Sequence, residues 1–191
     1  MPGGREFRAP LPRELTEGQR RIRATVLDGL SASQRALFDR EDGEGRLLGP
    51  FGLALLSPAI GGPSLAMGAA FRGSTVLTAR GREIAILAVA AATRCSYERY
   101  AHAAVGRSAG LGQDEVASLL DGTFAGADEV EEAIHRVAVA YLSTPTGRTP
   151  NLPAGAADVL DDRALYELLM LLGHYRNLAM AMGVFGVPAP E

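Results

Sequence analysis

Apolar side chains recur at helical spacing along most of the chain, and no segment shows the strict alternation of a half-buried strand. The first periodic run begins at Thr16, which pairs with Gln19 in a predicted capping box. This run places Ile22, Val26 and Leu30 on one face of a helix. We therefore expect an all-α fold in which helices bury their apolar faces against one another.

Glycine and proline interrupt the periodicity in the first third of the chain. Residues 1–15 are rich in proline and arginine and predict an extended arm. Residues 39–63 contain several glycines and prolines and predict a looser segment. Ser64 then begins a short predicted helix, which ends at Gly73.

The most apolar helix is predicted to begin near Thr78. Residues 84–92 are apolar on every face, which is typical of a helix surrounded by protein. We expect a break near Arg94 and a second helix from residue 95 or 96 to Ala109. We expect these two helices to pair at the centre of the fold as an antiparallel or angled hairpin.

Further helices are predicted in the second half of the chain, over residues 113–120, 129–142, 154–160 and 162–183. The second of them is amphipathic, and we expect His135 to lie on its solvated face. The side chains expected on its inward face are Val130, Ile134, Val137, Ala138 and Tyr141.

Composition and charge exclude several classes of protein. The 191 residues include 19 basic and 22 acidic ones, so the chain lacks the basic excess that holds a phosphate backbone, and we expect no nucleic-acid partner. The single cysteine, Cys95, excludes an intramolecular disulfide and is typical of a reducing compartment. Residues 47–71 carry no charge, but their prolines and glycines would break a membrane-spanning helix. With no apolar signal run at the N-terminus, we expect a cytoplasmic protein that does not enter a membrane.

The chain has one dense cluster of reactive side chains. Cys95, Glu98 and His102 are three and then four residues apart, so on a helix they share one face. Glu83 lies twelve residues before Cys95 and reaches the same face if the two central helices form a hairpin. On a partly buried surface, burial favours a proton on one carboxylate, whereas His102 favours ionisation of its nearest partner.

The run Arg82-Glu83-Ile84-Ala85-Ile86-Leu87, followed by Tyr97-Glu98-Arg99-x-x-His102, resembles the non-redox branch of the carboxymuconolactone decarboxylase and alkylhydroperoxidase D superfamily. Arg99 stands where that branch commonly has tryptophan. The resemblance covers about residues 45–188 and implies an alkylhydroperoxidase D-like helical bundle that assembles as a homotrimer or hexamer. We accordingly divide the chain into an N-terminal arm and helix, 1–44, and a carboxymuconolactone decarboxylase-like helical domain, 45–191.

Glu98 decides which chemistry the resemblance implies. In the redox branch a second cysteine occupies this position and resolves an oxidised thiol to a disulfide, which a carboxylate cannot do. The remaining chemistry is acid–base catalysis with no metal or organic cofactor, acting on a small carbonyl-bearing acid, lactone or related metabolite. The reaction would be a decarboxylation, an isomerisation or another proton transfer. We predict that Glu83, Glu98 and His102 are catalytic, with either glutamate as the base and His102 as the paired acid.

Three further residues are predicted to bind substrate, namely Cys95, Tyr97 and His174, the last because it lies in an apolar helix. Each candidate also has a structural explanation, such as a helix cap or ion pair for Glu83 and a satisfied core imidazole for His174. No histidine pair has the spacing of a zinc site, so we expect no metal. Two alternatives stay open: a non-catalytic oligomer that binds a hydrophobic ligand, and a one-cysteine thiol peroxidase.

Overall fold

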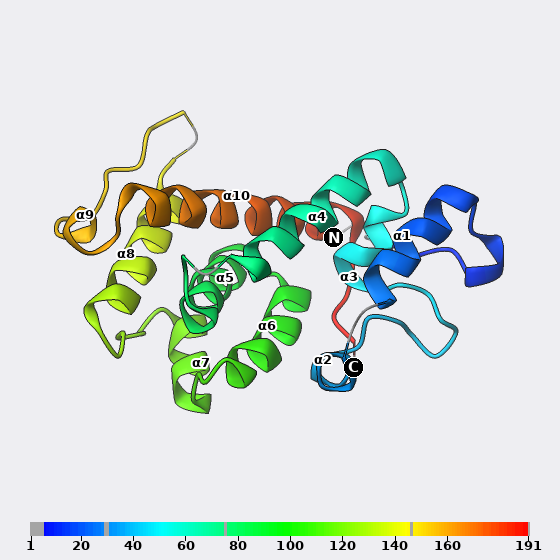
Figure 1. Ribbon diagram of the computed structural model, residues 1–191, viewed down its shortest axis with the longest axis horizontal. Helices are drawn as coiled ribbons and strands as arrows, with labels where there is room; N and C mark the ends of the chain where they lie inside the picture. The colour runs from blue at the N-terminus through cyan, green and yellow to red at the C-terminus, as the bar shows by residue number, and fades with distance from the viewer. Residues whose placement is uncertain (1–5, 29–30, 75, 146, 191) are drawn as a thin grey trace.

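The computed structural model describes residues 6–28, 31–74, 76–145 and 147–190, and within these ranges it contains helices and no paired strands (Figure 1). An isolated β-bridge joins Glu41 to Leu47. The prediction of an all-α fold is confirmed. In chain order the elements are a short 3-10 helix η1 Pro12–Glu14, α1 Glu17–Leu27, α2 Ala32–Leu37, α3 Gly49–Ala54, α4 Pro58–Gly73, α5 Ala79–Thr93, α6 Ser96–Ser108, α7 Gln113–Asp121, α8 Glu129–Ser143, α9 Ala156–Val159 and α10 Asp162–Phe185.

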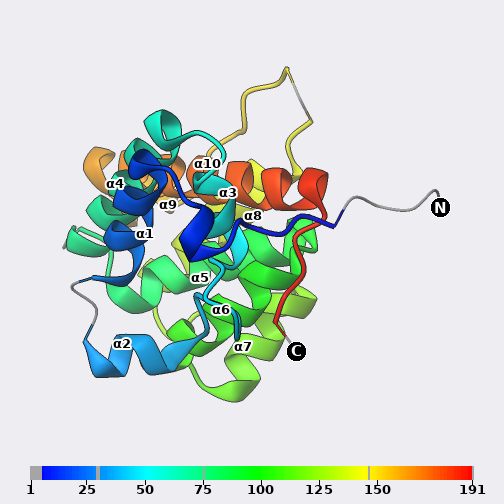
Figure 2. The same ribbon diagram turned by 90° about the vertical axis from the view of Figure 1, so that its right-hand side faces the viewer.

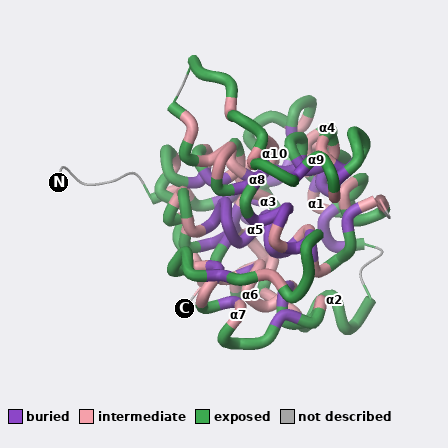
Figure 3. The backbone as a smooth tube through the Cα atoms, turned by 90° about the vertical axis from the view of Figure 1, so that its left-hand side faces the viewer, coloured by how far each residue is buried: buried purple, intermediate pink, exposed green. Residues whose placement is uncertain are grey.

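Helix α5 forms the centre of the molecule and packs against α6, α7, α8 and α10. Every residue from Glu83 to Ala90 is buried, which confirms the prediction of a helix surrounded by protein (Figure 3). Thr78 caps the helix, because its hydroxyl oxygen accepts a hydrogen bond of 2.9 Å from the backbone N–H of Gly81. Arg94 ends the helix in the left-handed conformation, at φ 53°, and α6 then packs back against α5.

Arg80 fixes the first turn of α5 to two neighbouring helices. Its guanidinium donates to Glu115 of α7 and, at 2.5 Å, to Glu131 of α8. A bidentate network of this kind holds a defined geometry better than an isolated surface pair does. Glu83 lies one helical turn further along α5, so the network also fixes the position of that carboxylate.

Helix α10 is the one helix among the described residues that is long and apolar enough to cross a membrane. The core helix of a soluble protein can meet the same two criteria, and 33% of the residues in the most apolar part of α10 are buried inside the molecule. It packs along α5 and contacts α3, α4 and α8. The side chains of Leu168, Leu171, Leu172 and Tyr175 are buried in these contacts.

The N-terminal segment is extended, as predicted, but it is packed on the helices. Ala9, Leu11 and Leu15 are buried. Phe7 donates its backbone N–H to the carbonyl of Phe185 at 3.1 Å, and the two rings meet edge to face. Figure 2 shows this segment crossing the C-terminal end of α10. The segment therefore closes one end of the bundle.

The predicted capping box of the first helix is confirmed. Thr16 donates its backbone N–H to the side-chain oxygen of Gln19 at 2.9 Å, and the Thr16 hydroxyl accepts from the Gln19 backbone N–H. Ile22 and Val26 are buried as expected. Leu30, the third residue of that predicted face, lies outside the described residues.

The prediction of a looser segment over residues 39–63 is wrong for its second half, and the helix predicted from Ser64 begins earlier. Helix α3 and the first turns of α4 occupy this stretch. Pro50 and Pro58 lie in the first turns of these helices, where proline is tolerated because the helix requires no N–H donor there. Gly61 allows α4 to lie directly on α3, since a Cβ at Gly61 would come within 2.3 Å of a backbone oxygen of α3.

Two expectations for α8 are wrong. His135, expected in solvent, is buried, with its ring 5.1 Å from that of Phe124. The connection from α7 to α8 places the ring of Phe124 on the face of α8 that carries His135. The sequence pattern of α8 alone does not predict this contact. Val130, expected to point inward, is 42% exposed. Ile134, Val137 and the neighbouring Ala138 are buried as predicted, and Tyr141 is partly buried.

An exposed apolar stripe follows the outer side of α10 and continues on α4. Its α10 members recur at helical spacing, so they lie on one face of that helix. We propose that a second copy of the chain covers this stripe, as in the homotrimer or hexamer expected from the sequence. The exposed side chains are Tyr166, Leu169, Met170, Met180 and Val184 on α10, with Ile60 and Met67 on α4.

We predict an oligomer at micromolar concentration, with trimer-based symmetry favoured over a dimer. Met180 is 59% exposed on the stripe, so Met180→Glu should reduce the assembly to smaller species by placing a charge in the interface. Leu152 is 47% exposed and lies in the connection between α8 and α9, outside the stripe, so Leu152→Glu is the matched control and should leave the assembly intact. Light scattering that returns a wild-type monomer would contradict the proposal.

Candidate functional site

The central helix pair holds one imidazole between two carboxylates. His102 of α6 places its Nδ1 2.7 Å from Oε2 of Glu83 on α5. Its Nε2 lies 3.3 Å from Oε2 of Glu98, one turn earlier on α6. The His102 side chain is 14% exposed, whereas Glu98 is 2% exposed. The three side chains form a row, Glu83–His102–Glu98, which we call the carboxylate–imidazole row.

Local structure brings the three residues together. The reversal at Arg94 folds α6 back along α5, so that the first turn of α5 faces the second half of α6. Gly106 of α6 lies against α5 at this point. A Cβ at Gly106 would lie 3.4 Å from Leu87 Cδ1 and 3.7 Å from the Cβ of Glu83. The expectation that Glu83 reaches the face of Glu98 and His102 agrees with this geometry.

Burial makes Glu98 an unusual carboxyl group. Its pKa is raised, first because desolvation penalises the charged form and then because the charge of Glu83 adds to this effect, while His102 opposes it. Its Oε1 is buried and has no hydrogen-bond partner among the described residues. A buried ionised carboxylate with an unpaired oxygen is costly, so burial favours the neutral form of Glu98, whereas the charge of His102 favours the ionised form.

His102 responds to the same surroundings in the opposite way. Burial alone would lower its pKa, but the charge and hydrogen bond of Glu83, together with the charge of Glu98, raise it. The distance of 2.7 Å between Nδ1 and the Glu83 carboxylate is that of a hydrogen bond, so we expect the imidazole to carry a proton on Nδ1. We then expect a second proton between Nε2 and Oε2 of Glu98, shared by the two groups as a coupled pair.

Tyr175 of α10 covers the imidazole. Its ring centroid lies 5.0 Å from that of His102 in an edge-to-face contact, and the residue is buried. Burial and the charges of Glu83 and Glu98 raise the pKa of its hydroxyl, which therefore keeps its proton. That hydroxyl makes no hydrogen bond to any part of the chain that the structure describes, so it is available as a donor. The site predicted from the sequence omitted Tyr175. Its position next to His174 in an apolar helix could have indicated that it lies near the site.

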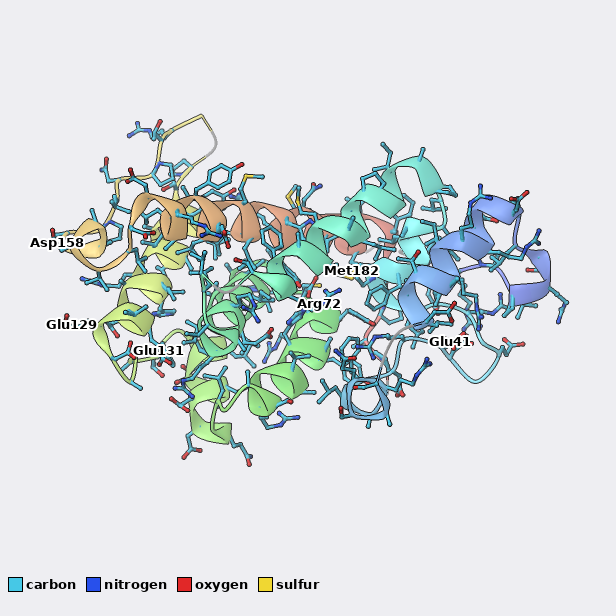
Figure 4. All side chains as sticks on the ribbon, viewed as in Figure 1. Glu41, Arg72, Glu129, Glu131, Asp158 and Met182 are labelled. Carbon is cyan, nitrogen blue, oxygen red and sulfur yellow. The ribbon has the colours of Figure 1, made fainter. Side chains whose placement is uncertain are left out.

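His174 lies one residue away but outside the row. Its ring contacts Tyr175 at 5.3 Å and Phe71 at 5.7 Å between centroids. Burial lowers its pKa, and the charge of Arg72 lowers it further, so the imidazole is neutral near pH 7. Arg72, at the end of α4, was also absent from the sequence-based site. Figure 4 shows it at the middle of the molecule, near α6 in this view.

Cys95 and Tyr97 occupy different surroundings from those expected. Cys95 lies just before α6 as its N-cap residue, and burial raises the pKa of its thiol. Tyr97 is buried with its ring over Gly49, where a Cβ would come within 2.2 Å of the ring, and its hydroxyl donates to the backbone oxygen of Asp39 at 3.4 Å. The structure thus directs Tyr97 toward the N-terminal segment, and a substrate-binding role for either residue stays a prediction.

No group of three His, Cys, Asp or Glu side chains within the described ranges is arranged to hold a metal ion. In the carboxylate–imidazole row, the ring separates the two carboxylates, so the donors do not converge on one point. A hollow of about 380 Å³ lies elsewhere, between α8, α9 and α10, and is lined mainly by apolar side chains such as Ile134 and Val159. Because it contains no comparable group of titratable residues, we place the chemistry at the row.

Comparison with known proteins bears on the family. Residues 64–140, fewer than half of the 191, match the model of the carboxymuconolactone decarboxylase family. Over this segment the chain is similar to that family. It contains Arg72 and all three residues of the row, whereas Tyr175 lies beyond it. No significant match was found among curated proteins or among solved structures.

We predict that Glu83 sets the proton affinity of His102. In the native protein His102 should titrate above its ordinary pKa of 6.5. In Glu83→Gln the largest raising contribution is lost while burial remains, so the pKa of His102 should fall below its wild-type value. Long-range ¹H–¹⁵N NMR spectra recorded against pH measure both values, with the His102→Ala spectrum giving the assignment. The titration of the distant His135 is the internal control, and an unchanged His102 curve would disprove the coupling.

Proposed function

We propose that this carboxymuconolactone decarboxylase family protein is a cofactor-free acid–base enzyme. Its substrate is a small carbonyl-bearing acid, lactone or related metabolite, which it decarboxylates or isomerises through an enolate. One observation carries the proposal: buried Glu98 has a raised pKa, one unpartnered oxygen, and a contact of 3.3 Å with an imidazole that Glu83 holds in place. A carboxyl group tuned toward neutral pH is suited to general acid–base catalysis.

In an isomerisation, Glu98 in its ionised form takes the proton from the carbon next to the substrate carbonyl. The C–H bond breaks, its electron pair moves onto the carbonyl oxygen as an enolate, and the proton bonds to Oε1 of Glu98. His102 stabilises the ionised form of Glu98 before this transfer through the proton on Nε2. The protonated Glu98 then returns the proton at a second carbon, which completes the isomerisation.

In a decarboxylation, the C–C bond to the leaving carboxylate breaks, and its electron pair forms the same enolate as carbon dioxide departs. Protonated Glu98 then supplies the proton that restores the carbonyl compound. In both reactions the hydroxyl of Tyr175 donates a hydrogen bond to the enolate oxygen. A preorganised donor in a site that excludes water stabilises such developing charge strongly.

The proposal is tested by comparing the turnover rates of the Glu98→Gln and His102→Ala variants with that of the wild type. A panel of small 3-oxo acids and unsaturated lactone acids is incubated with enzyme in D₂O, and ¹H NMR follows exchange of the acidic proton and loss of carbon dioxide. Each variant should lose about 10²-fold or more in rate, the range typical of a general acid–base group. The double variant should lose far less than the product of the two, because the residues act as one unit.

Exact multiplicativity of the two losses would show that the residues work independently. Full activity in either single variant would place the chemistry elsewhere. A wild-type protein that binds members of the panel without exchanging their protons would favour the non-catalytic binding protein instead. Circular dichroism of each variant verifies that the helical fold is retained.

We further predict that Cys95 is dispensable. Its raised pKa keeps the thiol protonated, and Glu98 occupies the position where a resolving thiol would be needed. Cys95→Ser should therefore keep at least about a tenth of the wild-type rate, since it removes no group of the proton-transfer unit. Complete loss of activity in a folded Cys95→Ser protein, with peroxide consumption by the wild type, would establish the thiol peroxidase alternative.

A further inference from the structure

The hollow of about 380 Å³ between α8, α9 and the start of α10 has apolar walls, and none of the three row residues lines it. Leu77, Ile134 and Leu160 are buried in its floor, whereas Val130 at its edge is 42% exposed. The hollow is therefore open to solvent above an apolar floor. Its volume falls in the range of roughly 300–1,000 Å³ that is typical of small-molecule pockets. It has room for the apolar part of a small ligand.

Two charged side chains, Asp161 and Arg163, also line this hollow. Arg163 offers no free positive charge, because its Nε lies 3.4 Å from Oε1 of Glu167 on the same helix. Asp161 accepts a hydrogen bond of 2.7 Å from the backbone N–H of Ala164, but it forms no ion pair with any residue in the described ranges. The charge left uncompensated by a side chain is therefore negative.

A second hollow, of about 320 Å³, adjoins the first, because Val159 lines both. Its other lining side chains are mostly charged, namely Glu129, Glu132 and Arg136 of α8 and Asp158 of α9. In the part of the chain that the structure describes, none of these three carboxylates forms an ion pair. Figure 4 shows Glu129 and Asp158 at the same end of the molecule. Negative charge thus predominates beside the apolar hollow.

An apolar hollow next to unpaired carboxylates is complementary to a ligand that has both an apolar body and a positive charge. Burial of the apolar body supplies affinity, and the carboxylates attract a cation and repel an anion. We propose that the two hollows form one binding site for a small organic ammonium ion. Its apolar part occupies the first hollow, and its charge faces Glu129 and Asp158. The site contains no residue of the row, so this inference goes beyond the proposed function and does not depend on it.

Three ligands with the same apolar body test the proposal. 4-Phenylbutylamine is the probe, and 4-phenylbutanol and 4-phenylbutyrate are its neutral and anionic analogues. In isothermal titration calorimetry at low ionic strength, the amine should bind about threefold or more tightly than the alcohol, and the carboxylate should bind most weakly. Added salt should weaken binding of the amine but not of the alcohol, because salt screens only the contribution of charge.

Val130→Trp tests the first hollow, because the indole ring would occupy the space of the phenyl group. This variant should weaken binding of both the amine and the alcohol about tenfold or more. Val139 lies on the same helix, is 47% exposed and lines neither hollow. Val139→Trp is therefore the matched control and should bind both ligands like the wild type.

The double variant Glu129→Gln/Asp158→Asn tests the second hollow. It should weaken binding of the amine about threefold or more and leave binding of the alcohol unchanged, since it removes charge but little apolar surface. Glu17 and Asp114 are exposed acids in the first turns of α1 and α7 and line neither hollow. Glu17→Gln/Asp114→Asn makes the same change in net charge and should bind the amine like the wild type.

Absence of amine binding by the wild-type protein would overturn the proposal, as would equal affinity for the three ligands or unchanged amine binding in a folded Val130→Trp protein. Glu98→Gln should bind the amine like the wild type, and loss of binding there would show that the probe binds at the row instead. A wild type that binds no amine, with an assembly that Val130→Trp but not Val139→Trp disrupts in light scattering, would assign the hollow to a second copy of the chain. Circular dichroism verifies that each variant is folded.

Discussion

The burial of Glu98 against His102 is the constraint on which the rest of the site depends. A carboxyl group that is 2% exposed, with one oxygen unpaired, is tolerated only because a proton lies on it or on the adjacent imidazole. Glu83 supplies the second charge that keeps the imidazole basic and oriented. Removing water from these three groups strengthens their mutual interactions.

Contacts in the surrounding fold fix the positions of the three residues of that row. Arg80 joins the first turn of α5 to α7 and α8, and the left-handed residue Arg94 folds α6 back onto α5. Helix α10 then covers the imidazole with Tyr175. None of these contacts touches a substrate, yet each fixes the distance between the carboxylates and the ring, and proton transfer is sensitive to such distances.

The sequence predicted the parts of the structure that rest on local signals. Hydrophobic periodicity predicts the buried central helix, and the residue types at a helix start predict the capping box at Thr16. The spacing of the reactive residues, three and then four apart, places them on one helix face. Helix α2 was missed although Ser31 and Gln34 form a capping box of the same kind. The burial of His135 depends on Phe124, which lies outside α8, so the periodic pattern of α8 does not encode it. Tyr175 was missed for the same reason, because its value as a donor comes from its place over a ring on another helix.

We expect a proton to be held between His102 and Glu98 in the resting protein. Neutron diffraction from deuterated crystals near neutral pH locates this proton directly. We predict one deuteron on Nδ1 of His102, directed at Glu83, and a second between Nε2 of His102 and Oε2 of Glu98. An Nε2 lone pair that faces an ionised Glu98, with no deuteron between the two atoms, would contradict this prediction of a shared proton.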